Sequence, residues 1–371
     1  MRFGLLALVA LLVSCSPTGK AIDVAIFERG SFPVTLDAWG VVLIRDGELV
    51  PNDRVVPYDL KSALFTDYAH KFRTVYVPEG KSGSGTNILK LPVGSILSKT
   101  FYYPKDANGL INSVDLGRSE SLDFGERGLA LDRVKLIETR LLVHLEDGWV
   151  GLPYVWDELG KQATLEITGS EVELSLRTGA GQQSFHYVVP DFNQCQGCHI
   201  ENLTAGAMAP VGFKSRHLDK PYVHLQKSEN QLQRFASLGL IEPVVGQDFS
   251  RTVDWQDTSK DLDDRARSYL DINCGHCHNP TGPADTSGMF LSRETTDLLH
   301  LGLCKPPVAA GQGTGGRPAG IFPGQPDQSV LVYRMGSLDL GAMMPELGRS
   351  LVHQEGVELI SNWIESLEGD C

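Results

Sequence analysis

The chain has 371 residues, a hydrophobic content of 42% and a formal net charge of −13 at pH 7. This length suits two or three domains with ordinary hydrophobic cores, and the acidity argues against nucleic acid as a partner, because phosphate binding needs clustered positive charge. The acidity has two interpretations: it keeps the protein soluble, or it favours salt-sensitive docking to a basic partner.

Residues 1–14 have the pattern of a bacterial export signal. Arg2 precedes an apolar run from Phe3 to Leu12, which is too short to cross a bilayer. The next residues complete Leu12-Val13-Ser14-Cys15, which resembles the lipobox of bacterial lipoproteins. The resemblance implies cleavage before Cys15, acylation of its thiol and, with Ser16 next, an outer-membrane anchor facing the periplasm. The alternative is an ordinary secretory signal that leaves Cys15 as a free thiol.

Residues 15–24 are expected to form a tether, and residues 25–190 a β-rich domain. Hydrophobic residues alternate with polar ones at 136–144, 148–156, 163–168 and 172–176, and turn signals such as Pro78-Glu79-Gly80 separate such runs. This segment contains no cysteine and no cluster of ligand-type residues. Its function is therefore expected to be docking of a partner or shielding of a neighbouring site.

Two Cys-x-x-Cys-His motifs follow, one at Cys195, Cys198 and His199 and one at Cys274, Cys277 and His278. In this motif the two thiols form thioethers with a haem and the histidine binds the iron. With 7 Cys and 10 His in the whole chain, two copies are not expected by chance. The sequence therefore predicts two covalently bound haem c groups. Zinc is the alternative, because cysteine and histidine also bind zinc, but export disfavours it.

Residues 191–257 are expected to hold the first haem in a segment that contains a helix over 222–238 and a linker over 241–257. The iron would have His199 on one side. The sequence leaves three alternatives for the other side: Met208, an open position, or one of the histidines His186, His217 and His224.

Residues 258–371 are expected to form the second haem domain. Amphipathic helices at 261–273 and 354–367 bracket the second motif and a Met343-Met344-Pro345 sequence. This layout resembles a class I cytochrome c domain, and the resemblance implies that Met344 is the second iron ligand beside His278. The expected fold class is thus α+β and multidomain: a β-rich N-terminal domain, a haem-binding segment and an all-α class I cytochrome c domain.

Two cysteines, Cys304 and Cys371, remain without an assigned partner. An exported compartment permits disulfides, so we expect these two to pair. The bond would close a loop of about 67 residues and contribute about 4 kcal/mol through chain entropy. The alternative is two unrelated thiols.

The mature chain as a whole resembles an uncharacterised family of bacterial di-haem c-type cytochrome lipoproteins, often encoded beside a parallel β-helix protein. The resemblance implies a partner in the periplasm or at the cell surface. The stretches that carry it are Pro57–Leu60, Leu64–Tyr68, Ser98–Pro104, Glu138–Leu142, Leu152–Trp156, Gln194–His199 and His278–Pro283.

These features predict an exported, lipid-anchored electron carrier with two haems and an unidentified redox partner protein. The main alternative is a di-haem enzyme, either an oxidase or peroxidase or the cytochrome subunit of a periplasmic dehydrogenase. A further alternative is a structural or sensing lipoprotein in which the β-rich domain carries the function.

Overall fold

The computed structural model describes residues 22–105, 111, 120–178, 181–202, 206–224, 227–308 and 311–371. The expected export signal and the acylation site Cys15 lie outside these ranges. Within them, no helix combines the length and apolar character needed to cross a membrane. The described part of the chain is β-rich, with 28% strand and 22% helix distributed over several sheets and seven helices.

A six-stranded antiparallel sheet forms the centre of the fold, with the strand order β3-β4-β5-β7-β8-β9. The central strands β5, β7 and β8 are rich in β-branched and aromatic residues and are buried along most of their length. The strands expected at 136–144 and 148–156 are confirmed as β7 and β8. The six strands are β3 (Val56–Tyr58), β4 (His70–Tyr76), β5 (Ile96–Pro104), β7 (Val134–Leu145), β8 (Gly148–Trp156) and β9 (Ala163–Leu165).

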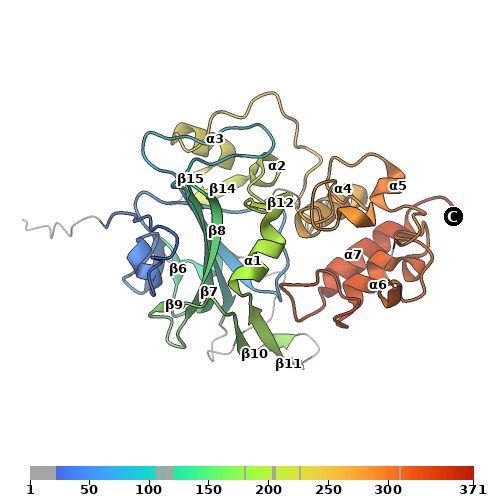
Figure 1. Ribbon diagram of the computed structural model, residues 1–371, viewed down its shortest axis with the longest axis horizontal. Coiled ribbons are helices and arrows are strands. Elements are labelled where there is room, and N and C mark those ends of the chain that lie inside the picture. The colour runs from blue at the N-terminus through green and yellow to red at the C-terminus, as the bar shows by residue number, and fades with distance from the viewer. Residues whose placement is uncertain are drawn as a thin grey trace, which may run out of the picture.

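Four smaller sheets and the helices surround this sheet. The smaller strands are β1 (Val42–Arg45), β2 (Glu48–Pro51), β6 (Leu129–Ala130), β10 (Ser170–Thr178), β11 (Gly181–Val189), β12 (Ile200–Asn202), β13 (Ala207–Met208), β14 (Pro221–His224) and β15 (Lys227–Asn230). The helices are α1 (Phe192–His199), α2 (Ser215–Leu218), α3 (Gln231–Ser237), α4 (Leu262–Asn273), α5 (Leu298–Leu301), α6 (Val330–Gly336) and α7 (Gln354–Glu365). In Figure 1, α4 to α7 gather on one side of the central strands, and α1 lies between the two groups.

The helix expected over 222–238 is wrong in its first half. Residues 221–224 and 227–230 pair as the antiparallel strands β14 and β15, and the helix α3 begins only at Gln231. The side chain of Asn230 accepts hydrogen bonds from the backbone N–H groups of Leu232 and Gln233, which makes it the N-cap of α3. A capping asparagine fixes where the helix begins, and the hydrophobic spacing alone does not report this boundary.

The expected fold class is also wrong, because no all-α class I cytochrome c domain is evident. The two long helices expected there exist as α4 and α7, and they pack on each other in one core. Between them, however, the chain forms only short helices and loops joined by isolated β-bridges. The segment is also hydrogen-bonded to the β-rich region: Asn273 accepts from the N–H of Phe65 at 2.8 Å, and Asp67 accepts from that of Ser350 at 2.7 Å.

Candidate functional site

The two Cys-x-x-Cys-His motifs open into a single cavity of about 790 Å³. This volume lies in the range of sites that hold cofactors and other organic ligands. All six motif residues named above line the cavity, together with Met344. The structure thus brings together two motifs separated by more than seventy residues of sequence, and it places the expected ligand Met344 with them.

The first motif lies on α1, which begins with a capping box. The side chain of Asp191 accepts from the N–H of Gln194, and the side chain of Gln194 accepts from the N–H of Asp191. The helix packs on β8 at Gly151, where an added Cβ would lie 3.1 Å from the Cβ of Cys195. The missing side chain therefore lets Cys195 approach the central sheet closely.

The second motif follows directly from the end of α4. The backbone turns at Gly275, where an added Cβ would lie 2.8 Å from the carbonyl oxygen of Asp271. The N–H of His278 then bonds to the carbonyl of Cys274 at 2.9 Å, which closes the motif into one compact turn. A larger residue at position 275 would force this turn apart, so the glycine between the two cysteines has a structural role.

Both motif histidines, His199 and His278, have Nδ1 beside a backbone carbonyl. Nδ1 of His199 lies 2.8 Å from the carbonyl of Ala209, and Nδ1 of His278 lies 3.2 Å from that of Met289. In the tautomer that donates these bonds, Nε2 keeps its lone pair for a metal. Burial, with the charge of Lys99, lowers the pKa of His199 to about 4, and burial also lowers that of His278. Both rings are therefore neutral at physiological pH, which is the form that binds iron.

The four motif thiols are free; Cys195 is buried, and the other three are half-buried. Burial raises the pKa of Cys195 to about 11 and those of Cys274 and Cys277 to about 12. The cysteines and histidines do not converge on one point as a zinc site would. In the described ranges, the one group whose ligand atoms lie within 4.8 Å of one another is Asp261, Asp263 and Asp264 at the start of α4. The donor set therefore fits two haems better than a metal ion bound directly.

The two methionines of the Met-Met-Pro sequence differ in environment. Met344 lines the cavity, whereas Met343 is 6% exposed and is not among the lining residues. The backbone N–H of Met344 donates to the carbonyl of Arg334 at 2.9 Å, which fixes this stretch against α6. Of the pair, Met344 is thus the one positioned to reach a group bound at His278.

Met208 is placed differently from Met344. It pairs with Ile200 in the β12–β13 hairpin and packs against an apolar cluster, and it does not line the cavity. The next residue, Ala209, holds His199 through its carbonyl. Met208 therefore lies close in sequence to the residue that holds His199 but is not among the residues that line the cavity.

Two of the other expected histidines, His217 and His186, are not among the residues that line the cavity. Nε2 of the buried His217 lies 3.1 Å from Asp271. The side chain of His186 is exposed and faces Glu171 at 3.6 Å. The side chain of His224 lies outside the described part of the structure.

Sequence reasoning missed His276, the residue between the two cysteines of the second motif. Its side chain lines the cavity, and its Nδ1 is buried without a hydrogen-bond partner in the structure. Burial, with the charges of neighbouring groups including His199, lowers its pKa to about 3. The motif allows any residue at this position, so spacing gave no reason to single it out.

A buried ionic network joins α2 to α4, the helix that leads into the second motif. Asp271 of α4 accepts two hydrogen bonds from Arg216 of α2, at 2.6 and 2.9 Å, and both side chains are at most 5% exposed. Burial acts to raise the pKa of Asp271, but His217 and Arg216 outweigh it and hold this pKa far below its usual range. The carboxylate is therefore charged and fixes the position of the second motif.

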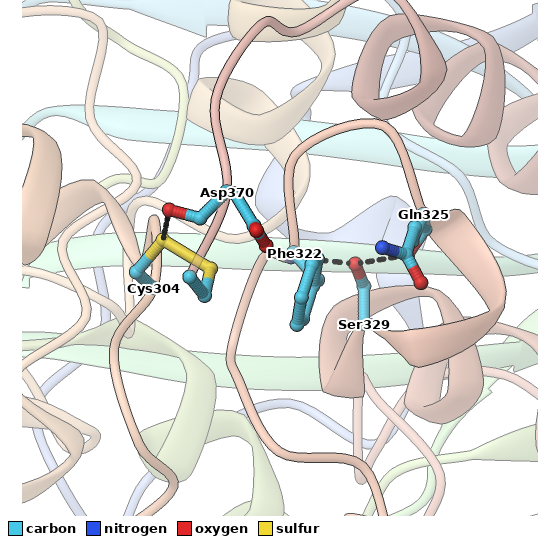
Figure 2. The surroundings of a disulfide bond; sticks show 6 residues. Cys304, Phe322, Gln325, Ser329 and Asp370 are labelled. Atoms are coloured by element: carbon cyan, nitrogen blue, oxygen red, sulfur yellow. Dashed lines mark hydrogen bonds between the residues drawn. A yellow bond between two sulfur atoms is a disulfide. The ribbon is translucent and has the colours of Figure 1, made fainter.

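Cys304 and Cys371 form a disulfide with a Cα–Cα distance of 5.2 Å, in agreement with the expected pairing. Figure 2 shows it beside Asp370 and near the loop in which Ser329 Oγ accepts from the N–H of Phe322 at 2.8 Å. The bond ties the last residue of the chain, which follows α7, to the loop after α5. It thereby restrains the end of the helix that packs on α4.

We predict that denatured, unreduced protein with both haems attached exposes no thiol at Cys304 or Cys371. Iodoacetamide should label neither residue before reduction and both after it, as read by peptide mass. The Cys304→Ser/Cys371→Ser variant should lose about 4 kcal/mol of unfolding free energy, because the unfolded chain is no longer cross-linked. Labelling of both residues without reductant would show that they are free thiols.

The cavity thus combines two Cys-x-x-Cys-His motifs, whose histidines bring Nδ1 beside a backbone carbonyl, and a methionine. Comparison with family models, with curated proteins and with solved structures gives no match for this chain. The case for its function therefore rests on these residues and their geometry.

Proposed function

We propose that this protein is an exported di-haem c-type cytochrome that transfers electrons to or from a redox partner, with a lipid anchor at Cys15. The observation that carries the proposal is the shared cavity: both motifs line it, and each motif histidine has Nδ1 beside a backbone carbonyl. Bound haem would supply reversible one-electron chemistry at iron.

The residues of the chain would hold and tune the two haems. The four motif cysteines fix their positions covalently, so neither haem is lost during electron transfer. His199 and His278 would each bind one iron, and Met344 would be a second ligand for the iron at His278. A thioether ligand raises the reduction potential relative to a second histidine.

His276 is the residue we propose for the other side of the first iron. It is buried at Nδ1, lines the cavity and lies close enough to His199 for their charges to interact. Ligation by a residue of the second motif would couple the two haems directly. This arrangement favours an electron carrier over the enzyme alternative, since an enzyme of the oxidase or peroxidase type needs an open iron position.

The spectrum of the protein with both haems attached distinguishes the two functions. We expect wholly low-spin haem in both redox states, a pyridine haemochrome typical of thioether-linked haem, and no change when the reduced protein is exposed to carbon monoxide. His276→Ala should convert one haem to a high-spin form that binds carbon monoxide. A high-spin component that binds carbon monoxide in the unaltered protein would instead favour the di-haem enzyme.

A further inference from the structure

Three cations lie in a row across the central strands of the sheet. Arg73 of β4 is directly opposite Lys99 of β5, and Lys99 is directly opposite Arg140 of β7. Residues paired in this way project from the same face of a sheet. All three line the cavity that the two motifs share. Like charges placed directly opposite each other destabilise a sheet, so this row has an energetic cost.

On one side of the row the same face is apolar. The neighbouring cross-strand row, two residues along, consists of Val75, Leu97 and Leu142, which are buried in one core cluster. On the other side, Phe101 belongs to a second core cluster and lies opposite Lys71 and Glu138. Placing a charge at a buried position is unfavourable without a partner, so each cation of the row needs one.

Two of the three cations have carboxylate partners within the protein. Arg73 donates to Asp59 at 2.9 Å, and Arg140 donates through Nε to Glu138 at 2.8 Å. For Lys99 the structure shows no carboxylate within ion-pair distance in the described ranges; its ammonium lies 5.1 Å from the ring centre of Phe101. Burial and the charges of Arg140 and Arg73 lower the pKa of Lys99 to about 7. The middle of the row therefore lacks a negative partner.

The row lies beside the first motif. The charge of Lys99 acts on His199, and the charges of Arg140 and Lys99 both act on Cys198. This proximity follows from the packing of α1 on β8, the strand next to β7 in the sheet. An anion held by Lys99 would thus be adjacent to whatever is attached at Cys195 and Cys198.

We propose that Lys99, flanked by Arg140, is a carboxylate-binding residue of the cavity. This inference rests on the proposed function. A carboxylate from either of two sources has the required chemistry: a propionate of the haem attached at Cys195 and Cys198, or a small carboxylate that enters the cavity from solution. In both cases the carboxylate would give Lys99 the negative partner that Arg73 and Arg140 already have. The β-rich region would then contribute directly to the haem site.

The test uses protein with both haems confirmed by mass. Lys99→Met removes the charge and keeps the side-chain length, Lys99→Arg keeps the charge, and Lys161→Met, at an exposed turn after β8, is the matched control. Spectroelectrochemistry should show that Lys99→Met favours the oxidised form of one haem at least tenfold, ~59 mV for one electron. In Lys99→Arg the reduction potential of that haem should stay close to the wild-type value. In Lys161→Met the potentials of both haems should equal those of the wild type.

Two further measurements identify the source of the carboxylate. If a propionate occupies the site, Lys99→Met shifts the propionate bending band in the resonance Raman spectrum, and wild-type protein shows no saturable binding of succinate. If a soluble carboxylate occupies it, succinate binds wild-type protein saturably, perturbs one haem spectrum, and does not bind Lys99→Met.

If Lys99→Met does not acquire both haems, Lys99→Gln is used in its place. The resonance Raman spectra of wild type and Lys99→Arg are then also compared. The inference is overturned if both haems are present, their potentials match those of Lys161→Met, the propionate band is unshifted and succinate does not bind. That result would leave the proposed function intact. Absence of covalent haem from wild-type protein would instead refute the proposed function.

Discussion

Asp271→Asn is expected to lower the free energy of unfolding by about 3–5 kcal/mol, because the buried Arg216 loses its buried carboxylate partner and keeps only the exposed Glu294. The substitution preserves side-chain volume, so the effect reports charge and hydrogen bonding. Chemical denaturation at pH 7 measures it. The control is Asp53→Asn: Asp53 is exposed and 3.8 Å from Arg45, and its loss should change stability by less than about 0.5 kcal/mol.

The pH dependence of this effect has a definite sign. The pKa of Asp271 is lower in the folded protein than its unfolded value of about 4, so its stabilising contribution is present above about pH 4 and declines as the pH falls further. The difference between wild type and Asp271→Asn should therefore shrink in acid. An equal stability loss for Asp271→Asn and Asp53→Asn at pH 7 would contradict the structural role assigned to this network.

Met344→Ala is expected to have the largest effect on the second haem. Loss of the thioether should remove the weak sulfur-to-iron band at the red edge of the oxidised spectrum. It should also lower the potential of that haem by on the order of 0.1 V, within the ~0.8 V span over which axial ligands act. Spectroelectrochemistry of the variant measures both.

Met343→Ala is the matched control for Met344, since the two are adjacent in sequence and differ in environment. Met343 is buried in the protein. Met343→Ala should therefore lower the free energy of unfolding by about 2–5 kcal/mol, because it leaves a cavity. It should leave the sulfur-to-iron band in place. If the band survives in Met344→Ala and disappears in Met343→Ala, the ligand assignment is reversed.

The sequence predicted the strands and helices whose hydrophobic residues recur with a clear period. It also predicted the sites made of cysteines at a characteristic spacing. Alternation located β7 and β8, the 3.6-residue period located α4 and α7, and cysteine spacing located both motifs. Counting the remaining cysteines located the disulfide. These signals are local, or they depend on residue types with few alternative roles.

Long-range placement was not predictable in the same way. The amphipathic faces of α4 and α7 show that these helices pack on something, but they do not report the hydrogen bonds of Asn273 and Asp67 that join the C-terminal segment to the β-rich region. The expectation of a separate class I cytochrome c domain failed for that reason. It also overlooked how much of the segment between the two helices is irregular.

The charged residues of the cavity escaped the sequence analysis because their surroundings are set by strand pairing. Lys99 and Arg140 lie 41 positions apart and face the cavity only because β5 and β7 pair in one particular register. A register shifted by one residue would turn such side chains to the other face. His276 was missed because the attachment motif does not restrict its position.

The most direct measurement of the central claim is the intact mass of the denatured protein made with a haem-maturation system. We predict a mass above that of the apoprotein by two haems, retained in acid acetone. Cys195→Ala/Cys198→Ala and Cys274→Ala/Cys277→Ala should each lose one haem, and the four-fold variant should lose both. A wild-type mass that shows one haem or none would contradict the account of a di-haem cytochrome.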